Sequence, residues 1–163
     1  MKYVIFGNAA LCWIIAYYLK SISPNILTFV ICDDTQKYVT INKSLIDKLR
    51  FFGLDQRDFF LGCLWSEENY IEESNVITME NLLETTEVTY TLDTQKTKKY
   101  FEDKCEKVFK YWNHGEDPNS TVDRVHHVNK DLLEVVYEKS SINHLKLSEN
   151  TVIKADIFVD MRI

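Results

Sequence analysis

The chain opens with Tyr3-Val-Ile-Phe-Gly-Asn-Ala-Ala-Leu-Cys-Trp-Ile-Ile-Ala-Tyr-Tyr-Leu19, and this segment says most about the fold. Residues 3–6 form a short apolar run with β-branched side chains, which is typical of a strand buried on both faces. Residues 7–8 interrupt that run, and residues 9–19 are then apolar on nearly every side, as in a helix covered by its neighbours. A second apolar run follows at 26–32. The pattern predicts a β–α–β unit with parallel strands and a right-handed crossover.

Residues 43–65 predict a helical insertion after this unit. Apolar side chains recur on one face of a helix over 44–52, and Gly53 fits the position just after a helix end. Asp55 is a candidate N-cap for a second, shorter helix. The apolar positions of the first helix are Leu45, Leu49 and Phe52.

The remainder of the chain predicts a strand, a long helix and a β-rich part. Residues 87–92 alternate like a strand, and Asp93 or Thr94 is the candidate cap of a helix that runs to about Trp112. Residues 113–120 have the composition of a loop. The apolar stripe of the helix is Phe101, Cys105, Val108, Phe109 and Trp112, and four further strands are expected over 122–128, 132–138, 142–147 and 152–160.

These elements together predict the fold class. We expect a single α/β domain over residues 1–163, with a Rossmann-like parallel sheet opened by the β–α–β unit. The helical insertion follows, and the β-rich C-terminal part ends in a strand that rejoins the sheet.

Composition and charge exclude several classes of protein. Of the 163 residues, 45% are hydrophobic and 27% are charged, which excludes a disordered or low-complexity chain. A net charge of -6 argues against a nucleic-acid partner held by phosphate contacts and against an anionic membrane surface. The apolar segment near the N-terminus is interrupted by Gly7-Asn8 and is short for a membrane span. We therefore expect a cytoplasmic protein.

The metal-binding residue types lack the spacing of a metal site. The four cysteines contain no C-x-x-C pair, so neither structural zinc nor a redox pair is predicted. Cys12 and Cys32 lie within apolar runs and are interpreted as small buried residues. His126 and His127 are adjacent on a predicted strand, so their side chains point to opposite faces and do not share a metal. No metal ion is expected.

The turn after the first strand is the best candidate binding motif. In a dinucleotide fold, a G-x-G-x-x-G turn places a helix N-terminus against a pyrophosphate, and an acidic residue after the second strand binds a ribose hydroxyl. Here Gly7 matches the first glycine, whereas Ala9 and Cys12 replace the other two. Asp33 stands at the end of the second strand. The pattern fits a dinucleotide site with Gly7 and Asp33 as contacts, and it fits equally a β–α–β unit that binds no ligand.

Four patches of the chain, in order, resemble flavin-dependent tryptophan halogenases. Residues 4–16 resemble the family's first strand and Gly-rich turn, with Trp13 at the position of the family's tryptophan. Thr40-Ile41 and the helix pair after it resemble the Ala-Thr-Ile-Pro segment and the Leu-Gly-Ile/Leu-Asp-Glu helices. Residues 90–93 and 153–160 resemble the Tyr-His-Phe-Asp and Leu-x-Ala-Asp-x-Phe-Ile-Asp strands. The resemblance implies the FAD-binding fold of that family.

Departures from the family pattern decide what the resemblance implies for activity. Halogenases use a Lys to direct the oxidised halogen, and no Lys or Arg occurs between Asp58 and Gln95. The Trp-x-Trp-x-Ile-Pro motif is absent, and Asn42 replaces the proline of Ala-Thr-Ile-Pro. A substitute such as Lys43 or Lys48 lies on the helix before the matched segment. We therefore expect no catalytic residues and no halogenase activity from the chain alone.

Two function hypotheses follow. The first is a non-catalytic halogenase-like protein that has an assembly, accessory or structural role in protein–protein interaction. It would bind no cofactor, it would act as a homo-oligomer or with a protein partner, and its Gly-poor composition suits an AT-rich viral genome and a place within a viral assembly. The second is an FAD-binding or adenine-nucleotide-binding subunit of a flavin-dependent halogenase or monooxygenase that another chain completes.

Overall fold

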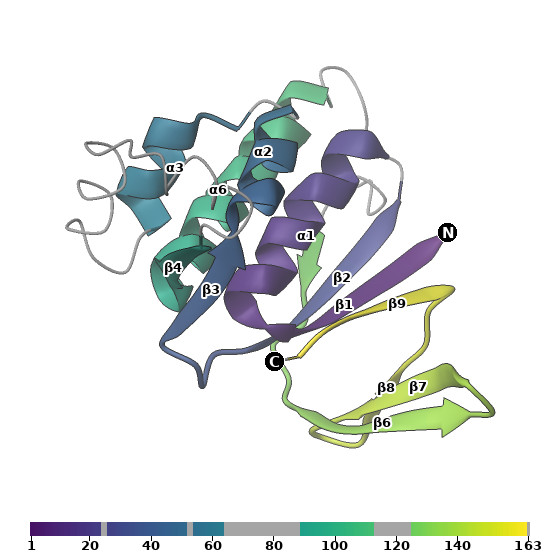
Figure 1. The fold of residues 1–163 in the computed structure, drawn as a ribbon. Helices are drawn as coiled ribbons and strands as arrows, with labels where there is room; N and C mark the ends of the chain where they lie inside the picture. Colours follow the sequence, from purple (N-terminus) through teal and green to yellow (C-terminus); the bar gives the residue numbers. More distant parts are fainter. Residues whose placement is uncertain (24–25, 52–53, 64–88, 113–124, 163) are drawn as a thin grey trace.

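The computed structural model describes residues 1–23, 26–51, 54–63, 89–112 and 125–162, which form an α/β fold (Figure 1). Its central layer is a four-stranded parallel sheet, sheet A, with the strand order β5-β2-β1-β9. The predicted parallel pairing of the first two strands is confirmed, as is the return of the last strand to the sheet. The strands of sheet A are β1 (Lys2–Asn8), β2 (Leu27–Asp33), β5 (Val125–His127) and β9 (Ile157–Met161).

The strand order of sheet A places a topological switch beside β1. From β1 the chain moves to β2 and then to β5 on one side, and it returns to the other side of β1 at β9. Open parallel sheets bind ligands outside the carboxyl ends of their strands at such a point. The carboxyl edge of sheet A, where β1, β2, β5 and β9 end, is therefore the place to look for a site.

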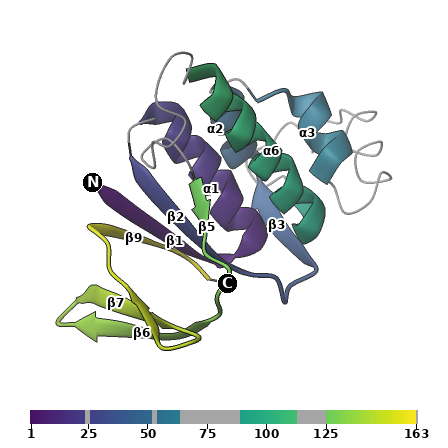
Figure 2. The same cartoon turned by 180° about the vertical axis from the view of Figure 1, so that it is seen from behind.

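A layer of helices lies over one face of sheet A: α1 packs on β1 and β2, and α6 packs beside α1, as Figure 2 shows. The rings of Tyr17 and Phe59 lie 5.6 Å and 5.7 Å from the ring of Phe101, centroid to centroid. These side chains join Ile5 and Val30 of the sheet in one apolar cluster. The predicted core positions Phe101 and Cys105 are thereby confirmed. The helices are α1 (Ala9–Ile22), α2 (Lys43–Phe51), α3 (Gln56–Cys63) and α6 (Thr94–Trp112).

A small antiparallel sheet is formed by β3 (Tyr38–Asn42) and β4 (Thr89–Asp93), which flank the predicted helical insertion. The strand β3 was missing from the sequence prediction, although its alternation of buried Val39 and Ile41 with exposed neighbours is a strand pattern. Side-chain carboxylate and amide oxygens accept the first free backbone N–H groups of the helices that follow. The acceptors are Asn42 for α2, Asp55 for α3 and Asp93 for α6, so the predicted caps Asp55 and Asp93 are confirmed.

The packing face of α2 differs from the prediction. Ile46 and Leu49 are fully buried, whereas Leu45 is only partly buried. The face is rotated because α2 packs beside β3 and the helical cluster rather than onto sheet A. Several predictions lie outside the residues whose side chains are described, and these concern Phe52, Gly53, Val108, Phe109, Trp112, the loop 113–120 and positions 122–124 of the predicted strand 122–128.

A third sheet, sheet C, covers the other face of sheet A. It consists of β6 (Leu132–Glu138), β7 (Ser141–Leu147) and β8 (Thr151–Ile153), all antiparallel. Its inward side chains, among them Leu145 and Leu147, pack against Phe6 and Ile31 of sheet A. The layers are therefore helices, sheet A and sheet C, as Figure 1 shows.

One predicted strand is wrong: residues 152–160 form two strands in two sheets. Strand β8 ends in sheet C, and β9 begins in sheet A. At the change of direction, the backbone N–H of Asp156 donates to the carbonyl oxygen of Lys2 at 3.0 Å. The Asp156 carboxylate accepts from the Lys2 backbone N–H at 2.7 Å. These two hydrogen bonds fix the start of β9 beside the start of β1.

Candidate functional site

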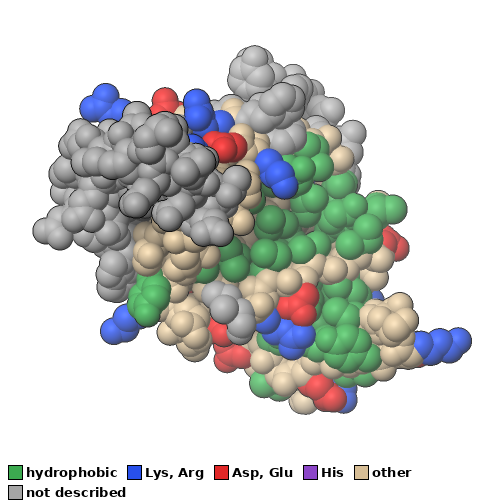
Figure 3. All heavy atoms as spheres, viewed as in Figure 1, with side chains coloured by type: hydrophobic (Ala, Val, Ile, Leu, Met, Phe, Trp, Pro, Cys, Tyr) green, Lys and Arg blue, Asp and Glu red, His purple; other side chains and the backbone are tan. Residues whose placement is uncertain are grey.

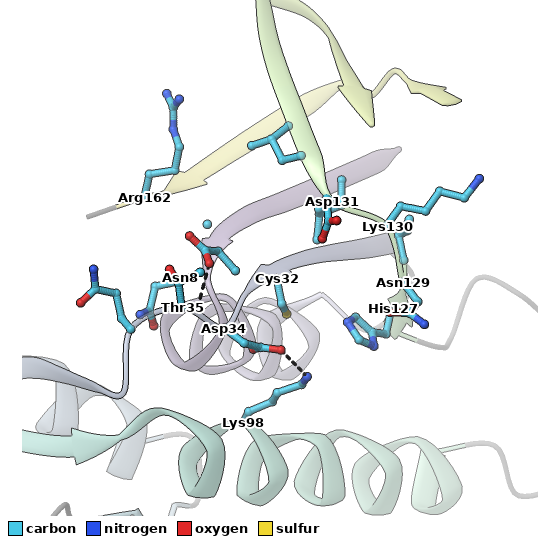
Figure 4. Close-up of a pocket in the computed structure, with 16 residues that line it drawn as sticks. Asn8, Cys32, Asp34, Thr35, Lys98, His127, Asn129, Lys130, Asp131 and Arg162 are labelled. Carbon is cyan, nitrogen blue, oxygen red and sulfur yellow. Dashed lines mark hydrogen bonds and ion pairs between the residues drawn. The ribbon is translucent and has the colours of Figure 1, made fainter. Parts of the chain in front are cut away.

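A cavity of about 750 Å³ lies at the carboxyl edge of sheet A (Figure 4). Its walls are the ends of β1, β2 and β9, the segment after β5, and one residue of α6. The volume falls in the range of small-molecule sites, about 300–1,000 Å³. Side chains of both charges line it, among them Asp33, Asp34, Asp131, Lys98, Lys130 and Arg162.

Gly7 lines this cavity, but its lack of a side chain serves the packing of the strands. Its φ angle is +127°, a conformation that favours glycine. A Cβ at this position would lie 2.3 Å from the carbonyl carbon of Met161 and 2.4 Å from the amide nitrogen of Arg162. Gly7 therefore allows the backbone at the end of β9 to approach the backbone of β1 closely at the topological switch.

Asn8 joins β1 directly to α1. Its side-chain oxygen accepts the backbone N–H of Leu11 at 3.2 Å and caps the helix. Asn8 is only 3% exposed, and its side-chain Nδ2 has no hydrogen-bond partner among the described residues. A buried amide without a partner costs free energy, about 1–3 kcal/mol. Asn8 therefore leaves an unused donor beside the cavity it lines.

Ala9 and Cys12, which replace two glycines of the dinucleotide motif, do not crowd the cavity. Both are fully buried, and neither is among the described residues that line it. Their Cβ atoms face the protein interior because α1 begins immediately after β1. The two substitutions therefore place no side chain in the cavity.

Asp33 lies where the sequence predicted an acidic contact. It ends β2 and is the register partner of Asn8 across the β1–β2 pair. One carboxylate oxygen accepts the backbone N–H of Thr35 at 2.9 Å, and the side chain is exposed in the cavity. The structure thus brings Gly7, Asn8 and Asp33 together at adjacent strand ends.

Cationic side chains that the sequence analysis missed line the cavity, among them Lys98 and Arg162, as Figure 4 shows. Lys98 of α6 pairs with the Asp34 carboxylate at 3.4 Å. Arg162 donates to both carboxylate oxygens of Asp160, at 2.9 Å and 2.7 Å, and these hydrogen bonds lower the pKa of Asp160. The only sequence signal for Arg162 was a basic residue directly after the last strand.

The prediction that Cys32 is a small buried residue is wrong, whereas Cys12 is fully buried as predicted. Cys32 lines the cavity because the register places it opposite Gly7 at the end of β2. A hydrogen bond from Cys12 and, less strongly, the charge of Lys98 lower the pKa of the Cys32 thiol. The same hydrogen bond, together with burial, raises the pKa of the Cys12 thiol.

The two adjacent histidines lie on opposite faces of sheet A, as predicted. The His126 ring stacks on Phe29 at 5.0 Å, whereas the His127 ring meets Trp13 edge-on at 6.2 Å. Within the described part of the chain, no group of three or more His, Cys, Asp or Glu side chains is placed to hold a metal ion. In that same part, no helix combines the length and the apolar character needed to cross a membrane.

Comparison with solved structures gives a consistent result. The chain is similar to a tryptophan C-6 flavin-dependent halogenase (chlorinase) from taromycin biosynthesis, with a TM-score of 0.62, 12% identity and coverage of 99% of this chain and 42% of that one. It is similar to a tryptophan 6-halogenase from Streptomyces toxytricini, with a TM-score of 0.61, 14% identity and coverage of 99% and 43%. It also matches MibH, a tryptophan 5-halogenase, with a TM-score of 0.58, 12% identity and coverage of 98% and 39%.

The predicted resemblance to flavin-dependent tryptophan halogenases is confirmed at the level of the fold. The chain spans about two fifths of the length of these structures. No protein-family model matches the sequence, and no curated protein sequence does. At 10–14% identity the likeness concerns the fold, so the function must be argued from the site.

Proposed function

We propose that the chain binds the adenosine diphosphate part of a flavin adenine dinucleotide at the carboxyl edge of sheet A. The observation that carries the proposal is the buried, unused Nδ2 donor of Asn8 beside the exposed carboxylate of Asp33. A donor for a phosphate and an acceptor for ribose hydroxyls are the two groups that a dinucleotide site supplies at these positions. Similarity to flavin-dependent enzymes supports this choice of ligand.

The residues at the cavity fit this part of the cofactor. Asn8, at the N-terminus of α1, would hold the pyrophosphate, since it lines the cavity and neither Ala9 nor Cys12 places a side chain there. Asp33 would hold the ribose through its carboxylate. Arg162 lies across the cavity, where a cation would balance phosphate charge. A bound flavin would supply redox chemistry, and the described residues supply its binding.

The chain is a binding module that does not halogenate by itself. Lys48 lines a separate hollow beside Leu11 and Leu45 rather than the cavity at the carboxyl edge. A lysine can present an oxidised halogen to its substrate only from a precise position, because a misplacement of about 1 Å lowers the rate on the order of a hundredfold. Lys48 therefore does not replace the halogenase lysine. Incubation with tryptophan, halide, oxygen, FAD and a flavin reductase should give no halotryptophan above a control without protein. Halotryptophan detected by mass spectrometry would contradict this assignment.

Isothermal titration with ADP and with FAD tests the binding proposal. Asp33→Asn should weaken the binding of both by about tenfold, which corresponds to about 1.4 kcal/mol. Asp131→Asn is the matched control, because it removes the same charge from the same cavity at a residue outside the β1–β2 ends. Equal losses for the two variants would mean that only net charge matters and would refute the role of Asp33.

Apolar side chains along α1 favour a second function, the binding of a protein partner without catalysis. Leu11, Ile15 and Tyr18 are only partly buried, and Ile22 is 47% exposed. Their spacing places them on one face of the helix, and Figure 3 shows hydrophobic side chains gathered on this side of the molecule. Such patches mark interfaces. Light scattering should show a homo-oligomer that Ile22→Asp dissociates; a monomer at micromolar concentration would count against self-association.

A further inference from the structure

Two cysteines that are far apart in the sequence meet at the carboxyl edge of sheet A. Cys12 belongs to the first turns of α1, and Cys32 to the end of β2. The Cys12 sulfur lies 4.0 Å from the carbonyl oxygen of Ile31, the residue directly before Cys32, and both cysteine side chains belong to the same apolar cluster. The β–α–β connection thus brings Cys12 close to the residue next to Cys32, which the sequence spacing did not suggest.

The two thiols differ in their access to the cavity. Cys32 lines it, and Figure 4 shows Cys32 on the side of Asp34 and Lys98. Cys12 is fully buried behind it. A small reagent in the cavity therefore reaches Cys32 first, whereas Cys12 is reached only through Cys32. This is the arrangement of an attacking thiol and a resolving thiol.

The charge of Lys98 favours the thiolate form of Cys32, the thiol that lines the cavity. The side chain of Lys98 is only 17% exposed and pairs with Asp34, which keeps the ammonium group near the end of β2. A nearby cation and a hydrogen-bond donor stabilise a thiolate, which is the reactive form of cysteine. Both groups lower the pKa of the Cys32 thiol, whereas burial and Asp34 oppose them.

We propose that Cys12 and Cys32 form a reactive dithiol that opens into the nucleotide cavity and reduces hydroperoxides. The Cys32 thiolate attacks one oxygen of the peroxide, so that an S–O bond forms, the O–O bond breaks, and the second oxygen leaves as hydroxide or alkoxide and takes up a proton. The Cys12 sulfur then attacks the Cys32 sulfur, and the S–O bond breaks. The thiol proton of Cys12 leaves with the hydroxide as water.

The overall reaction is balanced between the dithiol and the peroxide. The two thiols lose two electrons and two protons and form one disulfide, and the peroxide is reduced to water and an alcohol, or to two waters. The disulfide requires the two Cα atoms to lie within about 7 Å. Its formation would tie the first turn of α1 to the residue before Asp33, within the site proposed for the nucleotide.

Peptide mass spectrometry of the native protein tests the proposal, with two internal controls. Cys63 and Cys105 are buried in the helical core, and burial raises the pKa of each thiol to about 12. In iodoacetamide, Cys32 should be alkylated at least about a hundredfold faster than either control. One equivalent of hydrogen peroxide should then give a single cross-linked peptide pair, Cys12 with Cys32, lighter by two hydrogens and lost on reduction with dithiothreitol.

Variants separate the roles of the two thiols. In Cys12→Ala, peroxide should leave Cys32 as a sulfenic acid that dimedone traps, whereas Cys32→Ser should abolish both peroxide consumption and the cross-link. Cross-links that involve Cys63 or Cys105, or oxidation of Cys32 to the sulfinic acid without a cross-link in the unmutated chain, would overturn the proposal. So would an alkylation rate of Cys32 no higher than that of the controls.

The same assay distinguishes this proposal from the nucleotide site. Saturating ADP should slow the alkylation of Cys32 by at least about tenfold if the nucleotide occupies the cavity. Fast alkylation and cross-linking that ADP does not change would contradict the nucleotide proposal and leave the dithiol established. Protection of Cys32 by ADP without a Cys12–Cys32 cross-link would support the nucleotide proposal and overturn the dithiol proposal.

Discussion

The carboxyl edge of sheet A and the helical core around α3 and α6 contain the same residue types in opposite settings. The helical core holds Cys63 and Cys105, both buried, and the pKa of each thiol is raised to about 12 by burial. The carboxyl edge holds Cys32, which lines a cavity and has a lowered thiol pKa because Cys12 donates a hydrogen bond to it. Residue type alone therefore does not decide the reactivity of a cysteine. A thiol at the end of a parallel strand borders the cavity, whereas a thiol packed between helices is buried and stays protonated.

Glycine shows the same contrast. At Gly62 of α3, an added Cβ would lie 3.0 Å from the edge of the Tyr100 ring, so that a side chain rather than the backbone would have to move slightly. At Gly7, the neighbouring atoms belong to the backbone of β9, and the φ angle is +127°. Backbone geometry thus limits which residue position 7 at the carboxyl edge can hold, whereas side-chain packing limits which residue position 62 in the helical core can hold.

The largest expected effect concerns the pH dependence of thiol alkylation. At pH 7, Cys32 should react about a thousandfold faster than Cys105, because a thiol with a pKa of about 12 is almost fully protonated there. The lowered pKa means that the Cys32 rate should reach its plateau at a lower pH than that of free cysteine. The groups that face Cys32 are Cys12, Trp13, Lys98 and Asp34.

Rates measured between pH 6 and 10 by quenched alkylation and peptide mass spectrometry check this contrast, with unfolded protein as the reference. Parallel pH profiles for Cys32 and Cys105 in the folded chain would mean that the two regions do not differ in the way described.

The second effect concerns stability. Gly7→Ala should lower the free energy of unfolding by roughly 3 kcal/mol or more, since the new Cβ overlaps the β9 backbone and the φ angle is strained. Gly62→Ala is the matched control within a helix. Its change should stay within about 1 kcal/mol, because the gain in helix propensity offsets a movable ring contact.

Urea denaturation followed by circular dichroism measures both variants. If Gly7→Ala is as stable as Gly62→Ala, then the close approach of β9 to β1 is not what makes Gly7 necessary.

The smallest effect separates helix capping from ligand binding. Asn8→Ala and Asn42→Ala each remove the side-chain acceptor at a helix start, and each should cost about 1 kcal/mol of stability. Only Asn8→Ala should also weaken ADP binding, because only Asn8 lines the cavity at the carboxyl edge. Thermal unfolding and titration of both variants check this difference. If Asn8→Ala and Asn42→Ala bind ADP with equal affinity, then Asn8 only caps α1 and does not contact the nucleotide.

The parallel core of the fold could be predicted from the sequence, because apolar runs and their interruption report directly on buried strands and helices. The β–α–β unit, the caps Asp55 and Asp93, and the return of the last strand were all correct. The division of residues 152–160 between two sheets was not, since a continuous apolar pattern does not show where hydrogen bonds to Lys2 redirect the chain. The assignment of the chain as one domain stays a prediction, and so does a viral origin.

The site was predictable only where a motif occupies a fixed place along the chain. Gly7 and Asp33 were found because a strand, a turn and a second strand locate them, and the structure brings both to the cavity. Nothing in the sequence shows that the Asn8 side chain keeps an unused donor, and Lys98 and Arg162 were missed, since contacts between distant elements have no spacing rule in the sequence. The Cys12–Cys32 pair was missed for the same reason.

A ligand titration monitored by ¹H–¹⁵N correlation spectra tests the central claim most directly, that the carboxyl edge of sheet A binds an adenine nucleotide. With ADP, the backbone amides of residues 7–10 and 33–36 should shift progressively and saturate. The amides of residues 138–141, at the far turn between β6 and β7, should not move and serve as the internal control. Saturable shifts confined to the carboxyl edge are the predicted result. An unchanged spectrum at millimolar ADP, or shifts centred on sheet C, would contradict the claim.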